Sequence, residues 1–72
     1  MADITFKITK SLGVLSESAK GWTKEFNLVS WNGRGSKYDI REWDSKHEKM
    51  GKGLTFTKEE LVALKALLED IK

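Results

Sequence analysis

Apolar and polar residues alternate along three segments of the chain, a pattern typical of β-strands that bury one face. These segments are residues 4–15, 22–31 and 37–43. Gly13 interrupts the first segment and allows a bulge or a bend there. Residues 54–56 are too short to form a strand except beside others. The alternation therefore predicts three strands and a short fourth one.

Two connections between these segments carry turn residues. Residues 16–21 lack apolar periodicity and end in a glycine. The sequence N-G-R-G-S at residues 32–36 favours a hairpin, because Asn32 and Gly33 tolerate positive φ angles. Arg34 is expected at the tip of this hairpin.

Two of the predicted strands have chemically distinct faces. In the second, Phe26 and Leu28 are expected to lie in the core. In the third, Tyr38 and Ile40 form an apolar face, and the opposite face carries Lys37, Asp39, Arg41 and Trp43. Cations interleaved with aromatic rings suit a surface that holds a polyanion and stacks flat rings.

The period changes at Thr57, where a helix is predicted over residues 58–71. Thr57 as N-cap and Glu60 at the third helical position form a capping box. The apolar stripe is broader than a small sheet can cover, which favours self-association through the helix over a monomer with exposed apolar residues. The predicted dimer interface consists of Leu61, Leu64, Leu67, Leu68 and Ile71.

Composition indicates one small globular domain spanning residues 1–72, with 39% hydrophobic and 33% charged residues. A core of this size supplies only about 3–5 kcal/mol, and small domains compensate with disulfides, metals or oligomerisation. The chain has no cysteine, which leaves oligomerisation. Before residue 57 there are ten Lys/Arg against seven Asp/Glu, and from there on three against four. The cationic excess therefore lies in the predicted sheet.

The first ten residues contain no uninterrupted apolar run, which argues against a signal peptide or a membrane span. We therefore expect a soluble intracellular protein, located in the cytoplasm and compatible with association with the nucleoid.

The inventory of reactive residues argues against an enzyme. His47 is the single histidine, and Asp39 and Glu42 point to opposite faces of a regular strand. The G-R-G and G-K-G sequences lack the strand–loop–helix setting of a phosphate-binding loop. We expect no catalytic residues, no cofactor and no metal site.

Residues 38–43, Y-D-I-R-E-W, and 51–65, G-K-G-L-T-F-T-K-E-E-L-V-A-L-K, resemble the DNA-binding domain of the transcriptional coactivator positive cofactor four. The resemblance covers residues 29–71 and, more loosely, 14–28, and the chain looks like a short bacterial member. It implies an α+β fold: a curved four-stranded antiparallel β-sheet followed by one C-terminal α-helix. It also implies a helix-mediated homodimer with single-stranded DNA lying across the sheets.

The resemblance also assigns nucleic-acid-binding residues. The matching positions are Trp31, Arg34 or Lys37, Arg41 and Lys52. The family's I-R-E-Y-W reads I-R-E-W-D here, and Trp43 is assigned as a stacking platform on the face of Lys37 and Arg41. Trp22, Lys24 and Lys7 are further candidates whose facing the sequence leaves open. For each tryptophan the alternative is a place in the core.

These features predict sequence-tolerant single-stranded DNA binding by a homodimer, in transcription regulation, replication or repair, with the transcription machinery as a further partner. One alternative is a protein–protein interaction module in which the aromatic residues and the broad helix bind a polypeptide. Another is single-stranded RNA binding, because stacking and phosphate contacts do not read the 2′-hydroxyl.

Overall fold

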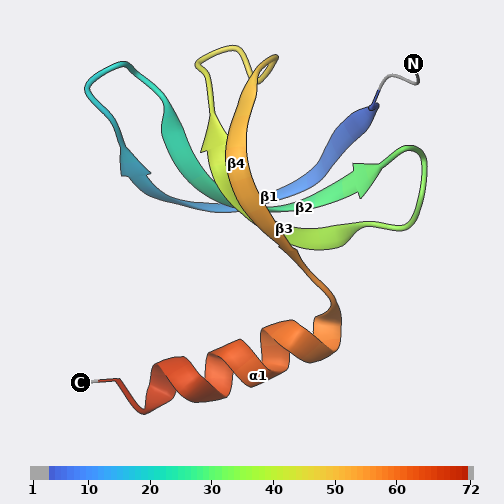
Figure 1. Ribbon diagram of the computed structural model, residues 1–72, viewed down its shortest axis with the longest axis vertical. Coiled ribbons are helices and arrows are strands. Elements are labelled where there is room, and N and C mark those ends of the chain that lie inside the picture. The colour runs from blue at the N-terminus through green and yellow to red at the C-terminus, as the bar shows by residue number, and fades with distance from the viewer. Residues whose placement is uncertain (1–3, 72) are drawn as a thin grey trace.

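The structure, a computed structural model, describes residues 4–71 and contains four strands followed by one helix. The elements are β1 (Phe6–Glu17), β2 (Thr23–Trp31), β3 (Lys37–Trp43), β4 (Met50–Phe56) and α1 (Lys58–Glu69). The strands form one antiparallel sheet in the order β1-β2-β3-β4. Figure 1 shows a strongly curved sheet with α1 on one side of it. The predicted order of four antiparallel strands and a C-terminal helix is confirmed.

The strand boundaries follow the sequence pattern except in β4. The third strand has the predicted bounds, and β1 is continuous with a register shift between Ser11 and Gly13. By contrast, β4 begins at Met50 and includes residues that were predicted as loop. Its pairing with β3 is irregular between Met50 and Gly53, and this register shift breaks the period-two pattern by which a strand is recognised.

Cross-strand pairing defines the two faces of the sheet, because directly opposite residues of an antiparallel pair point to the same side. One side, here called the groove face, carries the paired residues Glu25 and Arg41, and Asn27 and Asp39. The other, here called the helix face, carries Phe26, which pairs with Ile40. Side chains of the helix face and of α1 together line an apolar hollow of about 320 Å³.

The centre of the groove face is buried, and much of it is polar. Trp43 and Val29 are the buried hydrophobic residues, and Glu25, Asn27 and Asp39 are buried beside them. Phe6 of β1 packs against Trp43, and His47 of the loop after β3 pairs with Glu25. Phe26 and Leu28 were expected to lie in the core, but both are only half-buried, and they lie on the helix face.

The helix begins with the predicted capping box. The Glu60 amide donates to Thr57 Oγ1 at 3.1 Å, and the Thr57 amide donates to Glu60 Oε1 at 2.9 Å. No residue of the described helix is buried, and Leu67, Leu68 and Ile71, beyond or near its end, are more than half exposed. Within residues 4–71, no helix has the length and apolar character needed to cross a membrane.

Candidate nucleic-acid interface

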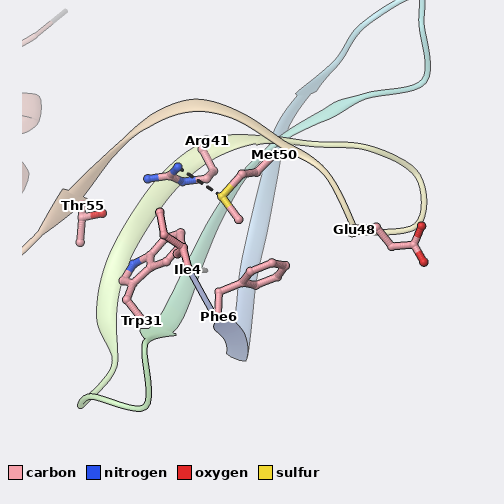
Figure 2. A pocket seen from close by; sticks show the side chains of 7 residues that line it. All are labelled: Ile4, Phe6, Trp31, Arg41, Glu48, Met50 and Thr55. Carbon is pink, nitrogen blue, oxygen red and sulfur yellow. Dashed lines mark hydrogen bonds between the residues drawn. The ribbon is translucent and has the colours of Figure 1, made fainter. Parts of the chain in front are cut away.

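The groove face contains an open groove of about 530 Å³ (Figure 2). Its walls come from all four strands, from the residues just before β1 and from the loop between β3 and β4. The lining residues are Ile4, Phe6, Trp31, Arg41, Glu48, Met50 and Thr55. The walls thus combine aromatic and aliphatic surface with one guanidinium and one exposed carboxylate.

Trp31, at the end of β2, forms one wall of this groove. Its ring lies opposite Phe6, the residue with which it pairs, at a centroid distance of 6.2 Å and an angle of 50°. The Arg41 Cζ atom lies over the ring, 4.8 Å from its centroid. The indole Nε1 has no hydrogen-bond partner within residues 4–71. That nitrogen is itself buried, but the ring as a whole is only half-buried, and an aromatic face of this kind is chemically suited to stack on a nucleobase.

The guanidinium of Arg41 forms an ion pair with the carboxylate of Asp39. Its Nε donates to Asp39 Oδ1 at 2.7 Å and its Nη2 donates to Oδ2 at 2.9 Å, and Thr55 Oγ1 also donates to Oδ2 at 2.9 Å. Asp39 is fully buried, and the Arg41 side chain is 14% exposed. Arg41 and Asp39 thus form a bidentate ion pair, which fixes the plane of the guanidinium.

Gly53, opposite Arg41 on β4, makes this arrangement possible. A Cβ atom at this position would collide with the Cβ of Arg41 and with the backbone carbonyl of Ile40. The absence of a side chain at residue 53 therefore lets β4 approach β3 closely beside Arg41.

Trp43 shares the groove face with Arg41, as predicted, but its side chain is fully buried. Phe6 covers its ring at a centroid distance of 5.2 Å, and His47 lies 5.9 Å away. The expectation that Trp43 presents an open stacking face is therefore wrong. Alternation along a strand assigns a side of the sheet, but it does not say whether that side is covered.

His47, the single histidine of the chain, pairs with Glu25. Its Nε2 lies 2.9 Å from Glu25 Oε2 and 3.1 Å from Oε1. Asn27 Nδ2 donates to Glu25 Oε1 at 3.1 Å, and Thr23 Oγ1 also donates to this carboxylate. Burial raises the pKa of Glu25, but these hydrogen bonds and the imidazole outweigh it and leave the pKa below its ordinary value.

Three of the predicted cations are exposed on or next to the strands that form the groove. Lys37 is exposed and pairs with Val29 on the groove face. Arg34 is exposed in the hairpin, where Asn32 and Gly33 have φ angles of 53° and 75° as expected. Lys52 is exposed on β4, within the register shift. Their contribution to binding stays a prediction.

Three other candidates lie away from the groove. Lys7 pairs with Ser30 and Lys24 pairs with Glu42, which places both lysines on the helix face. Trp22 lines a separate hollow together with Glu42. The structure thus does not bring these residues together with Trp31 and Arg41.

Sequence reasoning did not include Ile4, Phe6, Met50 and Thr55 among the site residues. Phe6 could have been found from the pairing of β1 with β2, because it lies opposite Trp31. Met50 carries no such signal, since it lies beyond the register shift of β4. Within residues 4–71, no group of three or more His, Cys, Asp or Glu residues is arranged to hold a metal ion.

The fold and the groove define a class of protein: small α+β domains in which a curved antiparallel sheet presents aromatic and cationic side chains beside a C-terminal helix. The chain matches the family described as "Transcriptional Coactivator p15 (PC4)" over residues 18–67, and it belongs to that family. The predicted resemblance is confirmed. Membership connects the chain in general terms with single-stranded DNA binding and with transcription.

The chain is also similar to a bacterial protein. An uncharacterized protein of Treponema pallidum (strain Nichols) is 48% identical over 69 residues, which cover 96% of this chain and 81% of that protein. This similarity extends beyond the residues matched by the family and includes β1.

Proposed function

We propose that this protein binds single-stranded DNA with little sequence preference, with the strand lying along the groove face. The observation that carries the proposal is the pairing of Trp31 with Arg41 in an open groove. Aromatic faces accept any base by stacking, whereas sequence readout needs several hydrogen bonds to base edges. The groove offers aromatic faces for stacking, from Phe6 and Trp31.

The phosphate path is assigned to exposed cations at the rim of the groove. Lys37, Arg34 and Lys52 are exposed, and none of the three makes an ion pair within the described residues. Free cations of this kind track a phosphate backbone and release its counterions on binding. The binding of a strand would therefore weaken as the salt concentration rises.

The direct test is a titration with oligo-dT, followed by intrinsic tryptophan fluorescence. Stacking of bases on Trp31 would quench the emission, and a duplex of equal length would compete poorly. An unchanged signal together with no binding in a second assay, such as fluorescence polarisation, would overturn the proposal and favour a protein-interaction module. Competition between oligo-dT and oligo-U of equal length measures whether DNA is preferred over RNA.

The proposal includes a homodimer formed through α1. Leu54, Val62, Leu67 and Ile71 are each more than 60% exposed, an unusual apolar surface for a chain of 72 residues. A second copy of the chain, packed against this surface and the apolar hollow, would cover it. The groove, on the opposite side of the sheet, would stay open in such a dimer.

Sedimentation velocity at micromolar concentration tests the dimer. The Leu67→Glu variant would sediment as a monomer of about 8.2 kDa, because a charge in an apolar interface is unfavourable. Glu69→Lys, which changes a charge on the same helix, is the matched control and would stay dimeric. A monomeric wild-type protein would overturn the dimer.

The cellular role follows from the same chemistry. Binding with little sequence preference suits strands exposed in transcription regulation, replication or repair, and it would place the protein in the cytoplasm beside the nucleoid. Contact with the transcription machinery is a further expectation. A fluorescent fusion that stays diffuse in cells treated to expose single strands would argue against this role.

A further inference from the structure

Arg41 lines the groove, but its hydrogen-bonding groups are already occupied. A guanidinium has five N–H donors. Its Nε and Nη2 donate to Asp39, and its Nη1 points to the Gly51 carbonyl oxygen at 3.4 Å and to Met50 Sδ at 3.5 Å (Figure 2). Arg41 therefore has few donors left for a phosphate, although its position in the groove suggests such a contact.

The charge of Arg41 is also compensated. Asp39 is fully buried, and its other partner is the neutral hydroxyl group of Thr55. A buried carboxylate that loses its cation is strongly destabilising. Turning Arg41 towards a phosphate would leave Asp39 in that state, so the ion pair opposes this movement.

The flat face of the Arg41 guanidinium, by contrast, contacts the Trp31 ring. Arg41 Cζ lies 4.8 Å from the centroid of the Trp31 ring, a distance typical of a cation–π contact. The bidentate pair with Asp39 fixes the plane of the guanidinium, and Gly53 lets the backbones of β3 and β4 come close at Arg41. The chain Asp39–Arg41–Trp31 thus connects a buried carboxylate with the aromatic wall of the groove.

We propose that Arg41 is a positioning residue, which supports strand binding by orienting the Trp31 ring for stacking and does not neutralise a phosphate. The inference rests on the proposed function and deepens it. It divides the cations near the groove into two kinds: Lys37 and Arg34 contact the backbone of the strand, and Arg41 prepares a surface for its bases.

A double-mutant cycle between Arg41→Lys and Trp31→Ala, measured with oligo-dT at fixed salt, tests this division. Lysine keeps the charge and can still reach Asp39, but it lacks the planar fork. We expect Arg41→Lys to weaken binding about threefold or more in the wild-type background and to have almost no further effect in the Trp31→Ala background. Equal effects in both backgrounds would overturn the proposal.

The salt dependence gives a second, independent measurement. The variant Asp39→Asn/Arg41→Met removes both charges of the pair, so that no buried charge is left alone. We expect its log–log salt slope to equal that of the wild type, whereas Lys37→Gln would lower the magnitude of the slope by about 0.7. If the magnitude of the salt slope of the double variant were lower by about 0.7, Arg41 would contact a phosphate, and the proposal would be overturned.

Circular dichroism first establishes whether each variant is folded. If Asp39→Asn/Arg41→Met is unfolded, the double-mutant cycle with Arg41→Lys alone decides. The outcomes also separate this inference from the function on which it rests. A wild-type protein that does not bind oligo-dT overturns both. A wild-type protein that binds, but with additive effects of Arg41 and Trp31, overturns only the positioning role.

Discussion

His47 and Glu25 are 22 residues apart in the chain, and His47 Nε2 lies 2.9 Å from Glu25 Oε2. The contact fastens the loop between β3 and β4 to the groove face of β2. His47 adopts a φ of 57° to reach it, and its ring also lies beside Trp43. Because the same loop supplies Glu48 to the wall of the groove, this pair connects the buried polar cluster with the proposed binding surface.

The first prediction concerns acid stability. The pKa of Glu25 is lower in the folded protein than in the unfolded chain, so its contribution to stability is present above the ordinary glutamate pKa of about 4.3. It is lost as the pH falls through the lower folded value. In urea unfolding between pH 3 and pH 7, the wild type should lose more stability below about pH 4 than Glu25→Gln.

At neutral pH, Glu25→Gln should be less stable than the wild type by about 1–3 kcal/mol, because it loses charged hydrogen bonds. Glu59→Gln, at an exposed position of α1, is the control. Parallel stability curves for the wild type and Glu25→Gln across the whole pH range would contradict the role assigned to this carboxylate.

The second prediction concerns Trp43. Trp43→Ala should lower the free energy of unfolding by about 3–5 kcal/mol, because the variant leaves a cavity beneath Phe6 in a small core. Chemical denaturation measures this loss, and Trp43→Phe should recover part of it. If Trp43→Ala were as stable as the wild type and only DNA binding were weakened, the ring would be a stacking platform after all.

The third prediction concerns Trp31. Trp31→Ala should weaken oligo-dT binding by about 1–3 kcal/mol, or about five- to 150-fold in Kd, through the loss of one stacked base. Its circular dichroism spectrum should match that of the wild type. Trp22→Ala, away from the groove, is the matched control and should bind normally. Equal losses in both variants would remove the special role of Trp31.

The fourth prediction concerns the face of the sheet that carries DNA. Lys37→Gln and Arg34→Gln should each lower the magnitude of the log–log salt slope by about 0.7, as expected for one released counterion on a single strand. Lys7→Gln and Lys24→Gln remove the same charge from the helix face and should leave the slope unchanged. The reverse result would move the strand to the helix face.

The sequence was most informative where one local interaction determines the structure. The alternation from Lys37 to Trp43 predicted the bounds and the two faces of β3, because a strand that buries one face needs that period. The Thr57 and Glu60 pair predicted the start of α1, because the capping box involves residues only three apart. Neither interaction depends on the rest of the fold.

Features that depend on distant parts of the chain were not predictable in this way. The burial of Trp43 requires Phe6 and His47, which come from β1 and from a loop. The facing of Lys7 depends on which residue of β2 lies opposite it, and this residue, Ser30, is distant in the chain. The sequence alone also did not show that Asp39 is fully buried and accepts a hydrogen bond from Thr55, because that contact depends on the pairing of β3 with β4.

The position of α1 on the side of the sheet opposite the groove has a consequence for avidity. Two copies joined through their helices would carry two open grooves on one particle. A strand long enough to reach both would bind the second groove as an intramolecular step, at an effective concentration set by the length of the intervening nucleotides. Affinity should then rise sharply once an oligonucleotide exceeds the span between the grooves, while a shorter one gains nothing from the second site.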